Sequence, residues 1–292
     1  MLTSGKNKGN VNENAHFLPF NKEFELSEKD LITDKNDVLG KGAYGVVLRG
    51  KYLEVEVAVK TTLPHADISY FKALLSELKV MAYVGNHKNI VRFFGAVTNQ
   101  IRERIVYIVL ELSTLGSLES NLKHYCRIYK NFTKDQMDNY KPHYSDASKI
   151  INTLDLISWS QQIAAGMRYL ETKKVIHGDL ATRNILLFNG NVAKITDFGL
   201  SRKLYDSSIY TKKNQTPLPW RWMALESLLW SVEFLQNLES GMRMYKPKYA
   251  TPEIYQILLK CWDEEPDHRP SFGELEEFFG NALVAYQELI IP

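Results

Sequence analysis

The chain has 292 residues, of which 45% are hydrophobic and 24% charged, and its formal net charge is +2. This length suffices for one large domain or two lobes with a sizeable core, and the composition is ordinary for a soluble globular protein. The near-neutral charge gives no sign of nucleic-acid binding. The sequence has no apolar run of about 18 residues and no signal peptide, so we expect no membrane segment in it.

The first third of the chain has the pattern of a small sheet. Residues 1–22 are rich in Asn, Lys and Gly without periodicity, and we interpret them as a flexible lead-in. Apolar residues at helical spacing over 68–84 predict one helix. Five runs predict an antiparallel sheet beside it: residues 38–39, 46–48, 55–60, 90–97 and 105–112.

After Leu112 the chain becomes mainly helical. A short helix is expected after Gly116-Ser117, and the polar, aperiodic stretch 126–152 is interpreted as an insert. Three helix starts follow, namely a long helix capped by Thr153, one with Pro252 at its first position, and a last one behind a capping box at Ser271–Glu274. The sequence therefore predicts an α+β protein with a sheet lobe before a helical lobe.

A glycine-rich turn, Gly40-Lys41-Gly42-Ala43-Tyr44-Gly45, leads into the second run of the sheet. Glycines at this spacing let backbone amides approach phosphate groups closely. A dinucleotide-binding fold has a helix after the third glycine, whereas a strand is predicted here, which argues against that fold. By itself the turn fits a plain hairpin equally well.

Lys60 ends the apolar stretch Val57-Ala58-Val59, where an unpaired ammonium group would be costly. Glu77, on the helix predicted over 68–84, is its natural partner. A lone lysine of this kind more often lies on an edge strand and faces water. The glycine turn just upstream instead favours a lysine that binds phosphate and pairs with Glu77.

Asp179, Asn184 and Asp197 should meet at one place. Strands predicted over 185–188 and 192–195, joined by a turn at Asn189-Gly190, would form a hairpin that brings the three together. Phosphoryl transfer needs a carboxylate that orients the accepting hydroxyl, and an amide and a carboxylate that hold Mg2+ on ATP. Each residue alone is ordinary in a turn, so the prediction depends on their combination and order. His177 is expected to pack and form hydrogen bonds rather than act as the base.

The spacing H-x-D-x-x-x-x-N followed by D-F-G resembles the catalytic core of protein kinases, and the form Leu180–Asn184 (L-A-T-R-N) resembles the tyrosine-kinase branch. The resemblance covers about residues 33–288. It is closest to receptor tyrosine kinases with a kinase insert, the platelet-derived, vascular endothelial and fibroblast growth factor receptor group. Five phrases carry it: Ser76–Lys79, Asn89–Gly95, Asp197–Arg202, Leu218–Ala224 and Pro266–Pro270.

This resemblance implies a two-lobed fold, with an N-lobe over 23–112 and a C-lobe over 113–288, and ATP and Mg2+ as cofactors. Asn184 and Asp197 would hold the metal, and Tyr210 would be the phosphorylation site of the activation loop. Glu111 to Ser113 would form the hinge that bonds adenine, with Leu110 guarding the pocket behind it. The implied catalytic residues are Asp179, Lys60, Glu77 and Arg183, and the implied ATP-binding residues are Gly40, Gly42, Gly45, Val47, Ala58, Lys60, Leu110, Glu111 and Ser113.

Three departures from the family pattern stand out. Gly178 replaces the arginine that pairs with a phosphorylated activation loop, which predicts a weak response to phosphorylation of Tyr210. Ala224-Leu225-Glu226 replaces A-P-E, a milder change. Only 34 residues separate Glu226 from Cys261, so the central helix of the large lobe is expected to be deleted after about residue 229. Losing several hundred Å2 of buried apolar surface would cost on the order of 10 kcal/mol.

From the sequence we expect a protein tyrosine kinase that phosphorylates tyrosine on protein substrates in receptor-type signalling. It would be cytoplasmic, or the cytoplasmic part of a plasma-membrane receptor, and would self-associate as receptor kinases do. The alternative is a catalytically inactive pseudokinase or truncated isoform that binds nucleotide or a partner protein. Gly178 and the deletion favour this alternative, while the full set of phosphate and magnesium residues favours the enzyme.

Overall fold

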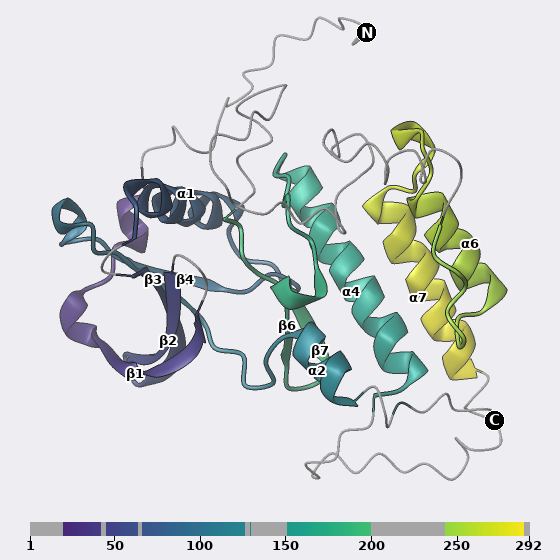
Figure 1. Ribbon diagram of the computed structural model, residues 1–292, viewed down its shortest axis with the longest axis horizontal. Coiled ribbons are helices and arrows are strands. Elements are labelled where there is room, and N and C mark those ends of the chain that lie inside the picture. The colour runs from purple at the N-terminus through teal and green to yellow at the C-terminus, as the bar shows by residue number, and fades with distance from the viewer. Residues whose placement is uncertain are drawn as a thin grey trace, which may run out of the picture. The chain divides into compact units, whose positions relative to one another are not determined.

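The computed structural model describes residues 20–41, 45–63, 66–125, 129, 151–199 and 243–288 (Figure 1). Gly42, Tyr210, most of the predicted insert and the position of the predicted deletion lie outside the described residues. The chain divides into two compact units. One contains the described residues up to Gly85 together with Arg92–Leu112 and Phe198-Gly199, and the other contains Asn86–Val91, Ser113–Asp197 and the described residues from Arg243 onward. None of the described helices is long and apolar enough to cross a membrane.

The first unit is built on a five-stranded antiparallel sheet, as predicted. Its strands run in the order β1-β2-β3-β5-β4. Val57, Val59 and Val109 are fully buried on one face and form the centre of its core, and helix α1 contacts β3 and β4. The bounds are β1 Leu31–Lys41, β2 Gly45–Tyr52, β3 Val55–Thr62, α1 Ile68–Val84, β4 Phe93–Val97 and β5 Tyr107–Glu111.

Strand β4 is shorter than the run that predicts it. We expected a strand over 90–97, but Ile90 and Val91 belong to the second unit, where the Val91 N–H donates to the carbonyl of Ile195 at 2.9 Å. These two residues are buried and apolar like the true strand residues, so hydrophobicity alone does not separate them from β4.

The chain before β1 docks against β4. The Leu26 N–H donates to the Ala96 carbonyl at 2.8 Å, and the rings of Phe24 and Phe93 lie 5.1 Å apart. Gly95 makes this approach possible, because a Cβ there would lie 2.4 Å from the Phe24 carbonyl oxygen. Asn21 caps a 3-10 turn at Lys22–Phe24, immediately before this contact.

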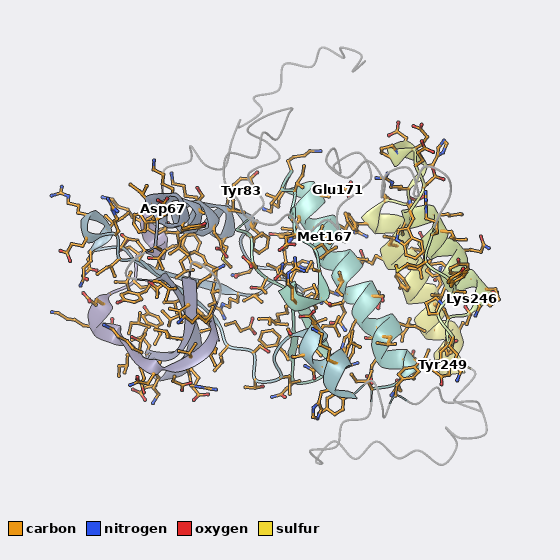
Figure 2. The ribbon with its side chains drawn as sticks, in the orientation of Figure 1. Asp67, Tyr83, Met167, Glu171, Lys246 and Tyr249 are labelled. Atoms are coloured by element: carbon orange, nitrogen blue, oxygen red, sulfur yellow. The ribbon has the colours of Figure 1, made fainter. Side chains whose placement is uncertain are left out.

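The second unit is mainly helical and carries a small hairpin. Helix α4 runs along α7, where Arg168 and Glu276 form a 3.0 Å ion pair, and α4 also packs on β7 (Figure 1). Met167 on α4 is buried, whereas Glu171, in the last turn of the helix, is exposed (Figure 2). The bounds are α2 Leu118–Tyr125, α4 Thr153–Thr172, β6 Ile185–Phe188, β7 Val192–Ile195, α6 Pro252–Cys261 and α7 Phe272–Glu288.

Two of the three predicted helix starts are confirmed. The Thr251 side chain accepts from the Ile254 N–H and Pro252 follows at the first position of α6, while Ser271 and Glu274 cap each other before α7. The third was misplaced by one residue. Asn152, not Thr153, caps α4, because its side chain accepts from the Asp155 N–H at 3.0 Å and forms a capping box with that residue. Asparagine caps helices at least as well as threonine.

Helices α6 and α7 are only partly buried. No residue of α6 is buried, the apolar stripe of α7 is only partly buried, and Val284 beside that stripe is 52% exposed. The short segment before α6 is also open: Tyr249 is exposed, and the Lys246 ammonium donates to the Ala250 carbonyl at 2.8 Å (Figure 2). Apolar helix faces that are this exposed to solvent are normally covered by another segment of the chain.

Candidate active site

His177 is completely buried in the loop between α4 and β6, and it links two parts of the second unit. Its Nδ1 accepts from the Asp179 N–H at 3.2 Å, and its Nε2 lies 3.0 Å from the carbonyl of Thr196. An acceptor at Nδ1 requires the proton at Nε2, so Nε2 donates to Thr196. Burial lowers the pKa of His177, which keeps the ring neutral, consistent with a positioning role rather than that of the base.

The Asp179 carboxylate is held by two neighbours on the 3-10 turn Thr182–Asn184. The guanidinium of Arg183 bonds Oδ1, and the amide of Asn184 donates to Oδ2 at 2.9 Å. Partial burial raises the pKa of Asp179, and Arg183 and Asn184 act against that rise. The carboxylate is thus fixed in orientation and made more basic than an ordinary one, as a group that accepts a hydroxyl proton requires.

The side-chain amide oxygen of Asn184 could hold a metal ion. Its side-chain NH2 donates to the backbone carbonyl of Asp179 at 2.8 Å as well as to the carboxylate, so these two acceptors fix which way the amide points. Among the described residues no donor reaches its Oδ1. Mg2+ takes oxygen ligands of this type, so this oxygen fits the metal that the resemblance implies.

Asp197 follows β7 by two residues and has a φ of +65°. A non-glycine residue in this left-handed region is strained, and such strain collects at functional sites. The hairpin is as predicted: Ile185 pairs with Ile195 and Phe188 with Val192. It therefore carries Asn184 immediately before its first strand and Asp197 just after its second.

Gly178 also lies in the left-handed region, with a φ of +79°. An arginine at this position would meet the usual cost of such a backbone conformation, which glycine avoids. Gly178 therefore provides no cation in the loop, and it adopts this backbone conformation between His177 and Asp179 without the strain of an L-residue.

The first unit contains the predicted lysine–glutamate pair. The Lys60 ammonium lies 2.7 Å from each carboxylate oxygen of Glu77, which projects from α1 and whose side chain is only 4% exposed. The pair is well desolvated, so each charge requires the other. The edge-strand alternative does not hold, because β3 lies inside the sheet.

The other predicted ATP-binding residues of the sheet share one face. Lys60 lies opposite Val47, which lies opposite Gly40, and Ala58 lies opposite Leu110. Cross-strand partners and residues two apart on a strand point to the same side, so all five share the face that bears the lysine. Strand β2 begins at Gly45, the third glycine, as expected.

The two ends of the predicted hinge, Glu111 and Ser113, belong to different units. In the first unit, Glu111 donates its N–H to the Arg92 carbonyl at 2.9 Å and accepts the Arg92 N–H on its carboxylate at 3.2 Å. In the second unit, the Ser113 hydroxyl donates to the Leu187 carbonyl at 2.6 Å. The Ser113 N–H has no acceptor among the described residues.

Two residues that support the hairpin were missed from sequence. The Asn89 amide donates to the Ala193 carbonyl at 3.0 Å and to Gln162 at 3.1 Å, and Gln162 in turn accepts the Ala193 N–H. This network ties the hairpin to α4. The only signal in the sequence was Gln162, which stands among the apolar residues of the helix predicted from Thr153. This signal is weak, because glutamine is also common on the solvent-exposed faces of helices.

Comparison with known proteins agrees with this geometry. The sequence model of the family described as protein tyrosine and serine/threonine kinase matches residues 33–232 and 229–279. The chain is 33% identical to mouse vascular endothelial growth factor receptor 1 over 94% of its length, and 32% identical to the zebrafish receptor 3 over 97%. It spans only about a quarter of these relatives, 27% and 25%.

The family match covers most of the chain and includes both the lysine–glutamate pair and the Asp179 cluster. The relatives are receptors of the type that the sequence motifs indicate, and the sheet and helices form the expected α+β arrangement. The chain therefore belongs to the protein tyrosine and serine/threonine kinase family.

Proposed function

We propose that this chain transfers the γ-phosphate of ATP to tyrosine side chains of protein substrates. The observation that carries the proposal is the arrangement around Asp179. A carboxylate is held by Arg183 and Asn184, while the Asn184 Oδ1 is left without a donor among the described residues. Placing a fixed carboxylate next to an available amide oxygen suits phosphoryl transfer, in which positioning and charge neutralisation supply most of the catalysis.

Each residue has a distinct task in this proposal. Asp179 accepts the proton of the substrate hydroxyl, and its raised pKa makes it a better acceptor. Lys60, oriented by Glu77, holds ATP phosphate oxygens above the glycine turn. Asn184 and Asp197 hold Mg2+, which neutralises phosphate charge when bound. Arg183 both orients Asp179 and favours tyrosine over serine, the latter by resemblance to the D-L-A-x-R-N form.

The names of the same relatives suggest where the chain works and how it is regulated. Because those proteins are named as receptors, we further propose that the chain works as the cytoplasmic part of a plasma-membrane receptor, self-associates, and is phosphorylated at Tyr210. Since Gly178 provides no cation, phosphorylation of Tyr210 should change activity little.

A second function, nucleotide or protein binding without catalysis, is favoured by the region after Glu226. The family match breaks into two stretches that meet at residues 229–232, and the alignment to the mouse receptor spans 358 residues, more than the whole chain contains. The thin cover over α6 and α7 fits the loss of a helix there. Such a loss would weaken the support of the catalytic loop without touching the nucleotide-binding residues.

Phosphate transfer from γ-labelled ATP and Mg2+ separates the two functions. The substrates are one polymer containing tyrosine and one containing serine, and Asp197→Asn protein is the control. The enzyme predicts labelled phosphotyrosine with the unaltered chain and little with the variant. If folded protein binds MgATP but labels neither polymer, the chain is a binding module.

A further inference from the structure

The segment Ser113–Ser117, which begins at the last residue of the predicted hinge, lies beside strand β6 of the hairpin. The Leu187 N–H donates to the Gly116 carbonyl at 2.9 Å, and Ser117 pairs with Leu186. Leu187 is buried, and both of its backbone groups point away from β7 toward this segment. Its carbonyl is bonded by the Ser113 hydroxyl at 2.6 Å.

The Ser113 hydroxyl also shapes the turn that it starts. It accepts the Gly116 N–H at 3.1 Å, while Gly116 has a φ of +73° that glycine adopts without strain. One hydroxyl thus closes the turn over residues 113–116 and fastens it to β6. The backbone N–H of the same serine remains without an acceptor among the described residues.

We infer that Ser113 is a positioning residue whose hydroxyl fixes its own backbone N–H, the expected adenine donor, relative to the metal ligands on the hairpin. Asn184 precedes Leu187 by three residues of extended chain, a span of about 10 Å. The Ser113 N–H, which is expected to bind adenine, and the Asn184 side chain, which is expected to hold Mg2+, are therefore both fixed relative to the short strand β6. This inference rests on the proposed function, because it assumes that the chain binds MgATP.

Removing the hydroxyl has a defined consequence. In Ser113→Ala the buried Leu187 carbonyl loses its donor and the turn loses its closing bond, so the N–H is no longer held in place. Because a buried acceptor that loses its donor is unfavourable and the N–H is no longer held in place, we expect the Kd and KM for MgATP to rise roughly 5-fold while kcat stays the same. Ser113→Thr keeps a hydroxyl and should bind nearly as the unaltered chain does.

The test measures binding by calorimetry and initial rates for the unaltered chain and three variants. Ser120→Ala is the matched control, since its hydroxyl caps the same segment by donating to the Ser117 carbonyl at 2.8 Å but does not reach β6. Magnesium tripolyphosphate, which has no base, should bind the Ser113→Ala protein and the unaltered chain equally. A general loosening of the site would instead weaken both ligands.

The outcomes are distinct. A selective loss of MgATP binding in Ser113→Ala, rescued by Ser113→Thr and absent in Ser120→Ala, supports the inference. Equal MgATP binding by Ser113→Ala and the unaltered chain overturns it, as does an equal loss for tripolyphosphate or a fall in kcat alone. If the unaltered chain does not bind MgATP, the proposed function itself fails.

Discussion

Any side chain at position 178 should destabilise the catalytic loop. Gly178 has a φ of +79°, and an L-residue in this region costs about 1–2 kcal/mol because its Cβ approaches the following carbonyl oxygen. The loop has little room to relax, since His177 is fully buried and accepts the Asp179 N–H. We expect Gly178→Ala to lower the free energy of unfolding by about 1–2 kcal/mol, and Gly178→Arg to lower it at least as much.

Urea unfolding, followed by tryptophan fluorescence and far-UV circular dichroism, measures this loss, and coincident transitions would show that one free energy describes it. Gly190→Ala is the control for backbone cost alone, because Gly190 has a φ of +75° and a Cβ there would meet nothing within 4 Å. The reasoning fails if Gly190→Ala loses about 1 kcal/mol while Gly178→Ala loses none, since the loop would then have a second conformation available.

Three further predictions concern other parts of the molecule. The Leu53–Glu54 turn has φ values of 44° and 66°, so Asn-Gly in its place should raise the free energy of unfolding by about 1 kcal/mol; an unchanged denaturation midpoint would contradict this. Lys60→Met leaves the Glu77 carboxylate buried without its cation and should cost about 3 kcal/mol. Adding Glu77→Gln should recover most of that loss in thermal unfolding, and no recovery would count against the pair. Arg183 acts to lower the pKa of Asp179, so Arg183→Gln should move the acid limb of the pH–rate profile to higher pH, whereas a shift to lower pH would refute the electrostatic account.

The hairpin and the lysine–glutamate pair could be predicted because local rules fix them. Asn189-Gly190 between two apolar runs specifies a hairpin, and a strand lysine followed by a helix glutamate specifies an ion pair when burial forces both charges together. The capping box before α7 and the proline at the start of α6 are local in the same way, and the start of α4 was misplaced by only one residue.

Features set by distant parts of the chain were not predictable. Ile90 and Val91 have strand-like composition, yet they pair with the end of β7 rather than with the sheet. The docking of residues before β1 depends on Gly95, whose need for close approach appears only when Phe24 is in place. Likewise, a serine at position 113 is unremarkable until folding brings it to the Leu187 carbonyl.

The most direct test of the central claim, that Asp179 accepts the proton of a tyrosine hydroxyl in a working site, compares the unaltered chain with Asp179→Asn. Both proteins are assayed in the same samples for MgATP binding by calorimetry and for transfer of labelled phosphate to tyrosine polymer. The account predicts equal MgATP binding and a loss of transfer of about 10²–10⁴-fold, because asparagine keeps the shape but cannot accept the proton. Transfer by Asp179→Asn at the rate of the unaltered chain would contradict it.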